Sequence, residues 1–290
     1  PGCKPLAAML LLAPAKLPPR ASAEEVFPHK TFTGSRGRVA LLKGCAQSVL
    51  DPGINQATIR LLNRRGIDVI MPKGEGCCGA LVHHMGKEEK AIAQAKINVD
   101  AWMTEVEGEG LDAIIITASG CGTTIKDYAH LLADEGEYAQ KAKVISGLAK
   151  DVTEYLASTA IEAADKKFDL KVAYHSACSM QHGQKIVSQP KDLLRAAGFD
   201  VVDVPEGHIC CGAAGTYNIL QSEISTRLRD RKVANIKAVK PDIIATGNIG
   251  CMTQIATGTD IPIVHTIELL DWAGGGPKPK ALQEVKITVE

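Results

Sequence analysis

A repeated spacing of cysteines constrains this chain more than any other feature. Cys45 is followed by thirty-one residues and then by an adjacent cysteine pair at 77–78. In the second half, Cys178 is followed by thirty-one residues and then by an adjacent pair at 210–211. Identical spacing at two places indicates an internal duplication, in which one structural unit occurs twice.

A single cysteine completes each copy of the pattern. Cys121 lies nine positions after Asp112, and Cys251 lies nine positions after Asp242. Eight of the nine cysteines therefore form two equivalent quartets. The ninth, Cys3, has no counterpart, and we interpret it as a surface or lightly buried thiol. The expected metal ligands are Cys45, Cys77, Cys78 and Cys121 in the first half and Cys178, Cys210, Cys211 and Cys251 in the second.

The two halves share one order of predicted elements. Short apolar runs predict strands at 38–43, 69–71 and 113–117, and at 170–174, 201–204 and 242–246. Segments with helical spacing predict helices at 54–65, 87–106, 190–197 and 223–239. Strands that alternate with helices are typical of an α/β fold with a parallel sheet covered on both faces. We expect two tandem, pseudo-equivalent lobes, each a small parallel sheet with flanking helices.

The repeat boundaries also predict the domain organisation. The expected parts are an N-terminal segment at 1–36, a first cysteine-rich domain at 37–155, a second at 168–276 and a tail at 277–290. Residues 156–167 are expected to join the two domains. Because the chain opens on a proline rather than on methionine, we expect that an upstream part precedes it.

The cysteines of each half come just after predicted strands. Because the carboxyl ends of parallel strands meet at one rim of a sheet, each quartet is expected to gather there. Several of the cysteines also precede a helix, whose N-terminal amides favour the thiolate form that binds metals. We expect Gly79, Gly122 and Gly212 to let the backbone pass close to a bulky cofactor.

Four thiolates suit either zinc or an iron–sulfur cluster. An odd number of cysteines in a protein that we expect to be cytoplasmic argues against disulfides. Zinc ribbons usually use two C-x2-4-C hooks, and adjacent cysteines plus distant single ones fit such hooks poorly. The alternative to metal binding is that the cysteines are buried structural thiols. Because the whole pattern is repeated, this alternative is disfavoured. We interpret His175 and His208 as polar lining residues rather than ligands, because four cysteines already complete a shell.

Composition excludes several classes of function. The chain has 290 residues, of which 45% are hydrophobic, and its 33 basic and 33 acidic residues cancel. The sequence contains neither a long basic run nor a stretch of basic residues interleaved with aromatic ones, so we do not expect it to bind nucleic acid. The longest apolar stretch near the start falls short of the ~20 residues that cross a membrane. We expect a cytoplasmic protein, with a peripheral position at the inner membrane face as the alternative. No Ser/His/Asp set or carboxylate pair predicts a catalytic site, and the G-x-G-x-x-G at 74–79 is not repeated in the second half.

The residues around the cysteines resemble a known family. C-C-G at 77–79 and at 210–212 resembles the twin CCG cysteine-rich domains of heterodisulfide reductase B subunits and lactate-utilisation proteins. Four longer segments are similar to glycolate oxidase iron–sulfur subunits: TASGCGTT at 117–124, YHSAC at 174–178, CCGAAGTYN at 210–218 and GNIGCMTQ at 247–254. The resemblance extends over about residues 37–276.

The resemblance implies an iron–sulfur electron-transfer subunit of an oxidoreductase complex, with a 4Fe–4S cluster in each CCG domain. Such a subunit accepts electrons from an FAD-containing subunit that oxidises glycolate to glyoxylate, passes them towards a quinone, and has no complete active site of its own. The alternatives are a zinc-binding or metal-free subunit that serves assembly, or the same subunit of a complex for lactate or another 2-hydroxyacid.

Two departures limit the resemblance. The family normally begins with a ferredoxin-like module, but no C-x2-C-x2-C-x3-C run occurs in this chain. Heterodisulfide reductase B subunits also have a fifth cysteine in each domain, where this chain has Thr124 and Gln254. Four thiolates in each half therefore predict an ordinary cluster or zinc, rather than the non-cubane clusters and the disulfide reduction of that relative.

Overall fold

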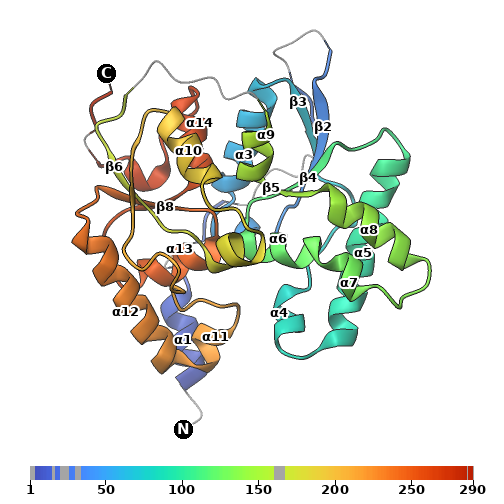
Figure 1. Cartoon of the computed structure of the whole chain (residues 1–290), viewed down its shortest axis with the longest axis horizontal. Coiled ribbons are helices and arrows are strands. Elements are labelled where there is room, and N and C mark those ends of the chain that lie inside the picture. The colour runs from blue at the N-terminus through green and yellow to red at the C-terminus, as the bar shows by residue number, and fades with distance from the viewer. Residues whose placement is uncertain are drawn as a thin grey trace. The chain divides into compact units, whose positions relative to one another are not determined.

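The chain folds into two compact units that each contain one half of the repeat (Figure 1). The computed structural model describes residues 4–14, 17–19, 26–29, 34–159, 167–285 and 287–289, so Cys3 lies outside the described residues. The first lobe is Pro18–Tyr155, and the second lobe consists of Pro1–Leu17 with Leu156–Glu290.

The first lobe is built on a five-stranded sheet of order β1-β3-β2-β4-β5. Its strands are β1 (Val26–Phe27), β2 (Gly37–Leu41), β3 (Ile67–Ile70), β4 (Ala113–Ile116) and β5 (Ala149–Asp151). All neighbouring pairs are parallel except β1 with β3. Every residue of β4 is buried, which is typical of a strand covered by helices on both faces. The predicted α/β fold is thereby confirmed for this half.

Helices surround this sheet. They are α2 (Gln47–Leu50), α3 (Gly53–Arg64), α4 (Ala80–His84), α5 (Glu88–Glu107), α6 (Ser119–Lys126), α7 (Tyr128–Leu131) and α8 (Tyr138–Leu148). A further helix, α9 (Val152–Ser158), crosses the boundary between the two units. Trp102 of α5 and Tyr128 of α7 are fully buried in one core with Ile114 and Ile116 of β4. This core lies next to the cysteines, because Cys78 belongs to it.

The second lobe repeats this architecture with a four-stranded parallel sheet of order β7-β6-β8-β9. The strands are β6 (Lys171–Tyr174), β7 (Asp200–Asp203), β8 (Ile243–Thr246) and β9 (Ile263–His265). Its helices are α1 (Lys4–Leu12), the π-helix η1 (Ser179–Gly183), α10 (Gln189–Ala196), α11 (Tyr217–Leu220), α12 (Ser222–Ala238), α13 (Ile249–Ala256), α14 (Thr266–Ala273) and the 3-10 helix η2 (Lys280–Leu282). Within the described ranges, no strand of one sheet pairs with a strand of the other.

The repeat continues further than the three predicted strands. Each sheet has another parallel strand, β5 or β9, and each of these is followed by a helix with the same N-terminal hydrogen bonds. Asp151 accepts from the Thr153 amide at 2.8 Å, while its own amide donates to Glu154 at 3.2 Å. His265 and Glu268 form the equivalent capping box at the start of α14. The lobes are therefore equivalent up to this last helix.

Burial of Asp151 predicts a measurable effect of pH on stability. The side chain is 1% exposed, and loss of solvation raises the pKa of this carboxyl to about 6, although Thr153 donates to it. The unfolded chain releases this proton near pH 4, whereas the folded protein keeps it until about pH 6. The folded state is thus stabilised below pH 4 and loses that contribution as the pH rises towards 6.

Asp151→Asn keeps a capping oxygen but does not ionise. Between pH 4 and pH 7 the wild type should therefore lose about 3 kcal/mol of stability that the variant keeps. The difference in the free energy of unfolding, variant minus wild type, should rise by that amount. Urea unfolding followed by circular dichroism at several pH values measures this difference. A difference that does not change with pH would contradict the account of this carboxyl.

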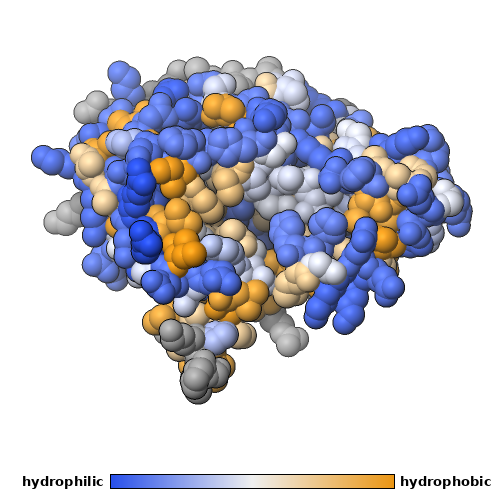
Figure 2. Space-filling model, turned by 60° about the horizontal axis from the view of Figure 1, so that its bottom comes forward, coloured by the Kyte–Doolittle hydropathy of each residue, from blue (hydrophilic) through white to orange (hydrophobic). Residues whose placement is uncertain are grey.

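The N-terminal residues are distributed between the two units. β1 pairs with β3 in the first lobe, whereas α1 packs against α11 and α12 in the second. Several apolar side chains of α1 stay exposed, among them Leu10 and Leu11. Figure 2, which brings this lower side of the second lobe forward, shows hydrophobic surface there. No helix in the described parts of the chain combines the length and the apolar character that a membrane span requires.

Candidate metal centres

The first quartet gathers beyond the carboxyl ends of three parallel strands. Cys45 follows β2, the pair at 77–78 follows β3, and Cys121 lies in the first turn of α6, directly after β4. The Sγ atoms of Cys45 and Cys77 are 3.7 Å apart, which is far too long for a disulfide. Cys78 is in hydrogen-bond contact with both Cys77 and Cys121. The four sulfurs therefore form one continuous group.

The electrostatics of the first quartet favour a thiolate at Cys77. The pKa of Cys77 is lowered to about 2, because Cys45 and then Cys78 donate hydrogen bonds to its sulfur. The pKa values of Cys45 and Cys78 are raised, first by the hydrogen bonds that hold their protons and then by burial. A cation between the sulfurs would lower the pKa values of Cys45 and Cys78 and so favour their thiolate forms. A thiophilic metal ion or cluster supplies this positive charge, so the donor set fits such a group.

The second quartet has the same arrangement. Cys178 follows β6, the pair at 210–211 follows β7, and Cys251 lies in the first turn of α13 after β8. The Sγ atoms of Cys178 and Cys210 are 4.0 Å apart. The amide of Gly212 donates to the Cys210 sulfur at 3.3 Å.

Two thiolates are favoured in this quartet, at Cys210 and Cys251. The pKa of Cys210 is lowered to about 2 by hydrogen bonds from Cys178 and then Cys211. The pKa of Cys251 is lowered to about 6, first because Cys211 donates to it and then because His175 lies nearby. The pKa values of Cys178 and Cys211 are raised, in each case most by their hydrogen bonds to Cys210. This quartet also fits a metal bound by sulfur, with a histidine at its edge.

The structure explains why a glycine follows each cysteine pair, which the sequence alone did not reveal. Gly79 and Gly212 have φ angles of +84° and +91°, in the left-handed region that side chains rarely adopt. A Cβ on Gly79 would lie 3.2 Å from the Ala91 carbonyl oxygen, and one on Gly212 only 2.4 Å from that of Ser225. The long helices α5 and α12 thus pack directly on the cysteine loops. That these glycines and Gly122 line a cofactor stays a prediction.

Buried polar side chains of the first lobe hold the loop that contains Cys77. Asn98, on α5, accepts from the Gly76 amide at 2.7 Å and donates to the Cys77 carbonyl at 3.0 Å. Tyr128 donates to the Cys78 carbonyl at 2.8 Å and accepts from Asn98. Because these groups are fully buried, their hydrogen bonds fix the loop firmly.

The second lobe uses a buried cation for the same task. Lys232, on α12, is fully buried, and its ammonium donates to the carbonyl oxygens of Glu206 at 3.0 Å and Gly207 at 3.5 Å. Lys232 lies seven residues after Ser225, as Asn98 lies seven after Ala91, so the two side chains are equivalent in the repeat. Positive charge in this position is favourable beside thiolates, and it distinguishes the second site from the first.

Thr124 and Gln254, which stand where heterodisulfide reductase B subunits have a fifth cysteine, form hydrogen bonds within their own lobes. Thr124 donates to the Gly120 carbonyl within α6 at 3.2 Å. Gln254 donates to Ser225 at 2.9 Å and accepts from Asn218 at 3.0 Å. Both side chains therefore contribute to helix packing, which agrees with four thiolates in each lobe.

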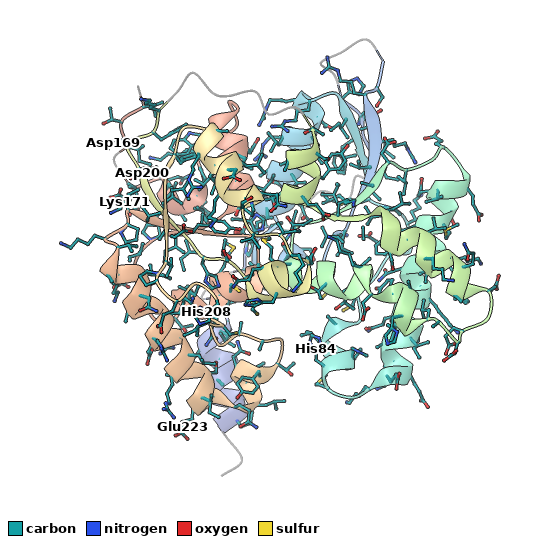
Figure 3. All side chains as sticks on the ribbon, in the orientation of Figure 1. His84, Asp169, Lys171, Asp200, His208 and Glu223 are labelled. Atoms are coloured by element: carbon teal, nitrogen blue, oxygen red, sulfur yellow. The ribbon has the colours of Figure 1, made fainter. Side chains whose placement is uncertain are left out.

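The two histidines that the sequence grouped together differ in environment. His208, labelled in Figure 3, is exposed on the loop before the second cysteine pair. His175 is 1% exposed, and its ring nitrogen and the sulfurs of Cys211 and Cys251 all lie within 4.8 Å of one another. Sequence reasoning did not identify Asn98 or Lys232, and it placed Tyr128 on a solvated helix face, whereas the structure buries that side chain against the cysteine loop. The available signal was a polar residue on an apolar helix stripe, as at Ala95, Asn98 and Trp102.

A duplicated α/β fold with a cysteine quartet at each sheet rim defines a class of tandem cysteine-rich domain proteins. The family model described as "CCG: Cysteine-rich domain" matches residues 39–126 and 172–256. The chain belongs to this CCG family and contains two copies of its domain, as the resemblance implied.

Named relatives are similar over most of this chain. The "Glycolate oxidase iron-sulfur subunit" of Escherichia coli is 40% identical over 259 residues, which cover 89% of this chain and 63% of that protein. The "Probable glycolate oxidase iron-sulfur subunit" of Bacillus subtilis is 30% identical, with 90% of this chain and 61% of that protein covered. "Lactate utilization protein A" of Bacillus licheniformis is 26% identical, and the match covers 81% of this chain and 99% of that protein.

The chain spans about six-tenths of the length of the two glycolate oxidase relatives. Among solved structures, a "hypothetical protein from Helicobacter pylori" has a TM-score of 0.56 at 11% identity, and the match covers 96% of this chain and 55% of that one. At this identity the likeness concerns the fold alone.

Proposed function

We propose that this chain is the iron–sulfur part of a flavoprotein complex that oxidises glycolate. The observation that carries the proposal is the presence of two complete cysteine quartets in a chain 40% identical to a glycolate oxidase iron–sulfur subunit. Zinc fits the same donors chemically, but the names of the relatives favour iron and sulfide.

The residues of this chain would hold and tune the metal groups. The two quartets supply the ligands, and the buried hydrogen bonds of Asn98 and Lys232 fix the loops that present them. An iron–sulfur cluster, when bound, supplies a one-electron centre whose potential depends on ligands, hydrogen bonds and burial, within roughly −700 to +450 mV. The helices packed on the loops at Gly79 and Gly212 limit how far the ligands can move.

Oxidation of the hydroxyacid is assigned to a partner that contains FAD. The sequence offers no acid–base pair for removing hydrogen from a hydroxyacid and no repeated dinucleotide motif. In this division of labour, the flavin oxidises glycolate to glyoxylate and is itself reduced by two electrons. A quinone takes up these electrons and two protons and closes the cycle.

We expect substitution of Cys45 or Cys178 by serine to slow electron transfer without preventing oxidation of the substrate. In the assembled complex, flavin bleaching by glycolate should stay within about twofold of the wild type, whereas flavin reoxidation by quinone or dye should slow by about tenfold or more. Stopped-flow absorbance measures both steps. Cys3→Ser, which removes the cysteine outside the repeat, is the matched control and should change neither rate.

Two results would contradict the proposal in different ways. Anaerobically prepared chain without iron, sulfide or visible absorption would exclude the electron carrier and favour a structural role. Glycolate turnover by the purified chain with dye, and without any flavoprotein, would refute the assignment of the flavin to a partner.

A lactate-oxidising complex is the second candidate, because lactate utilization protein A is covered over 99% of its length by this chain. It differs from the first in partner and substrate only. The hydroxyacid that bleaches the flavin of the co-purifying partner distinguishes the two.

A further inference from the structure

His175 occupies a place in the second lobe that an apolar residue occupies in the first. It follows β6, and its amide donates to the Ala245 carbonyl at 2.8 Å. In the first lobe, the Leu42 amide donates to the Ile115 carbonyl at 3.0 Å, and Leu42 precedes Cys45 by three residues, as His175 precedes Cys178. The backbone positions are therefore equivalent, and both side chains are buried.

No hydrogen bond of ordinary geometry reaches either ring nitrogen of the buried imidazole, although the ring lies near enough to the Cys251 sulfur to lower the pKa of that thiol. Leaving a buried polar group unpaired costs roughly 1–3 kcal/mol, and such groups in native proteins usually have a ligand or an ordered water to satisfy them. A leucine fits the equivalent place in the first lobe without this cost. The histidine therefore needs an explanation other than packing.

The surroundings of the ring point to a metal. A ring nitrogen of His175 and the Sγ atoms of Cys211 and Cys251 all lie within 4.8 Å of one another, and all three residues are buried. Metal–nitrogen bonds of about 2.0 Å and metal–sulfur bonds of about 2.3 Å allow three donors at such separations to reach one ion. The donors come from three segments, which follow β6, β7 and β8.

We propose that His175 is a metal ligand of the second centre, which makes that centre a mixed thiolate–imidazole site, while the first centre is bound by thiolates alone. One ring nitrogen gives its lone pair to the metal, and the other keeps its proton. The identity of the metal group as an iron–sulfur cluster rests on the proposed function, but ligation by the histidine does not. Replacing thiolate by histidine raises the reduction potential of such centres, so the second centre should be the easier one to reduce.

Pulsed electron paramagnetic resonance tests the proposal directly. The full chain with Cys78→Ser, in which only the second site is expected to fill, is labelled with ¹⁵N-histidine, loaded with iron and sulfide without oxygen, and reduced. We expect a nitrogen coupling of the strength of direct ligation, lost in His175→Leu and kept in His182→Leu, whose histidine is exposed in the same lobe. The midpoint potential should fall in His175→Leu only.

Binding of Co²⁺ to the metal-free chain tests the ligand independently of iron and sulfide. His175→Leu should weaken binding at the second site about tenfold or more and change the visible spectrum of that site, while the first site keeps its affinity. The leucine is the residue of the equivalent position, so we expect the variant to fold; should it fail, His175→Gln gives the same comparison.

The outcomes separate the two proposals. Iron–sulfur signals without strong nitrogen coupling, or Co²⁺ affinity unchanged by His175→Leu, would overturn the ligand and leave the proposed function intact. Failure to assemble iron and sulfide, with Co²⁺ binding still sensitive to His175→Leu, would overturn the proposed function and support the ligand.

Discussion

Replacing Cys78 with serine should empty the metal centre of the first lobe and leave that of the second lobe filled. Cys78 is 4% exposed and contacts both Cys77 and Cys121, so its sulfur lies in the middle of the first quartet. Serine presents a hard oxygen that ionises far less readily than a thiol and suits soft metals poorly. Because every ligand of the second quartet comes from its own lobe, the loss should not spread.

Metal content per chain measures this effect and should fall to about one half. Cys211→Ser is the mirror variant and should remove the other half, since Cys211 has the equivalent contacts with Cys210 and Cys251. Cys3→Ser controls for the loss of a thiol as such. Loss of both metals from Cys78→Ser, in a protein whose circular dichroism is unchanged, would show a single shared site instead of two.

Gly212→Ala should destabilise the second lobe strongly. The residue has a φ angle of +91°, and its added Cβ would lie 2.4 Å from the Ser225 carbonyl oxygen, which belongs to the backbone of α12 and cannot rotate away. The Ser225 hydroxyl also donates to the Gly212 carbonyl at 2.8 Å, so a shift of the helix breaks that bond. Backbone strain and overpacking together should cost about 3 kcal/mol or more.

Gly79→Ala is the matched comparison in the first lobe. Its φ angle is similar, but its Cβ would lie 3.2 Å from the Ala91 carbonyl oxygen, so the strain without a severe clash should cost about 1–2 kcal/mol. Urea unfolding of the metal-free variants measures both values. Equal losses in the two variants would contradict the role assigned to the close approach of α12.

The sequence allowed the central parts of the fold to be predicted because their patterns are strong. Ala113–Ile116 and Ile243–Thr246 are continuous apolar runs bounded by polar residues, and both are buried parallel strands. The equal cysteine spacing also predicted correctly that the thiols come together after the strands. These signals are local in the chain and are repeated, so each half supported the interpretation of the other.

Other parts carry signals too weak to predict. The strands β5 and β9 have three residues each, and Ala149–Asp151 contains two charged residues, so neither the length nor the pattern marks a strand. The π-helix after Cys178 has no counterpart among the predicted elements.

The distinction between His175 and His208 is also tertiary. Both lie close to cysteines in the sequence, but only the positions of β6, β7 and β8 in the sheet bury one ring against two sulfurs. Asn98 and Lys232 are a further example, because their equivalence depends on how α5 and α12 cross the cysteine loops. Sequence spacing reveals which residues approach a sheet rim, whereas burial and contact decide what each of them does.

The central claim is that each lobe holds its own iron–sulfur centre. The most direct measurement is the iron and acid-labile sulfide content of the anaerobically prepared full chain, combined with a reductive titration followed by electron paramagnetic resonance. The account predicts iron and sulfide in both lobes and two signals, one lost in Cys78→Ser and the other in Cys211→Ser. Zinc in both sites, or iron without sulfide, would contradict it.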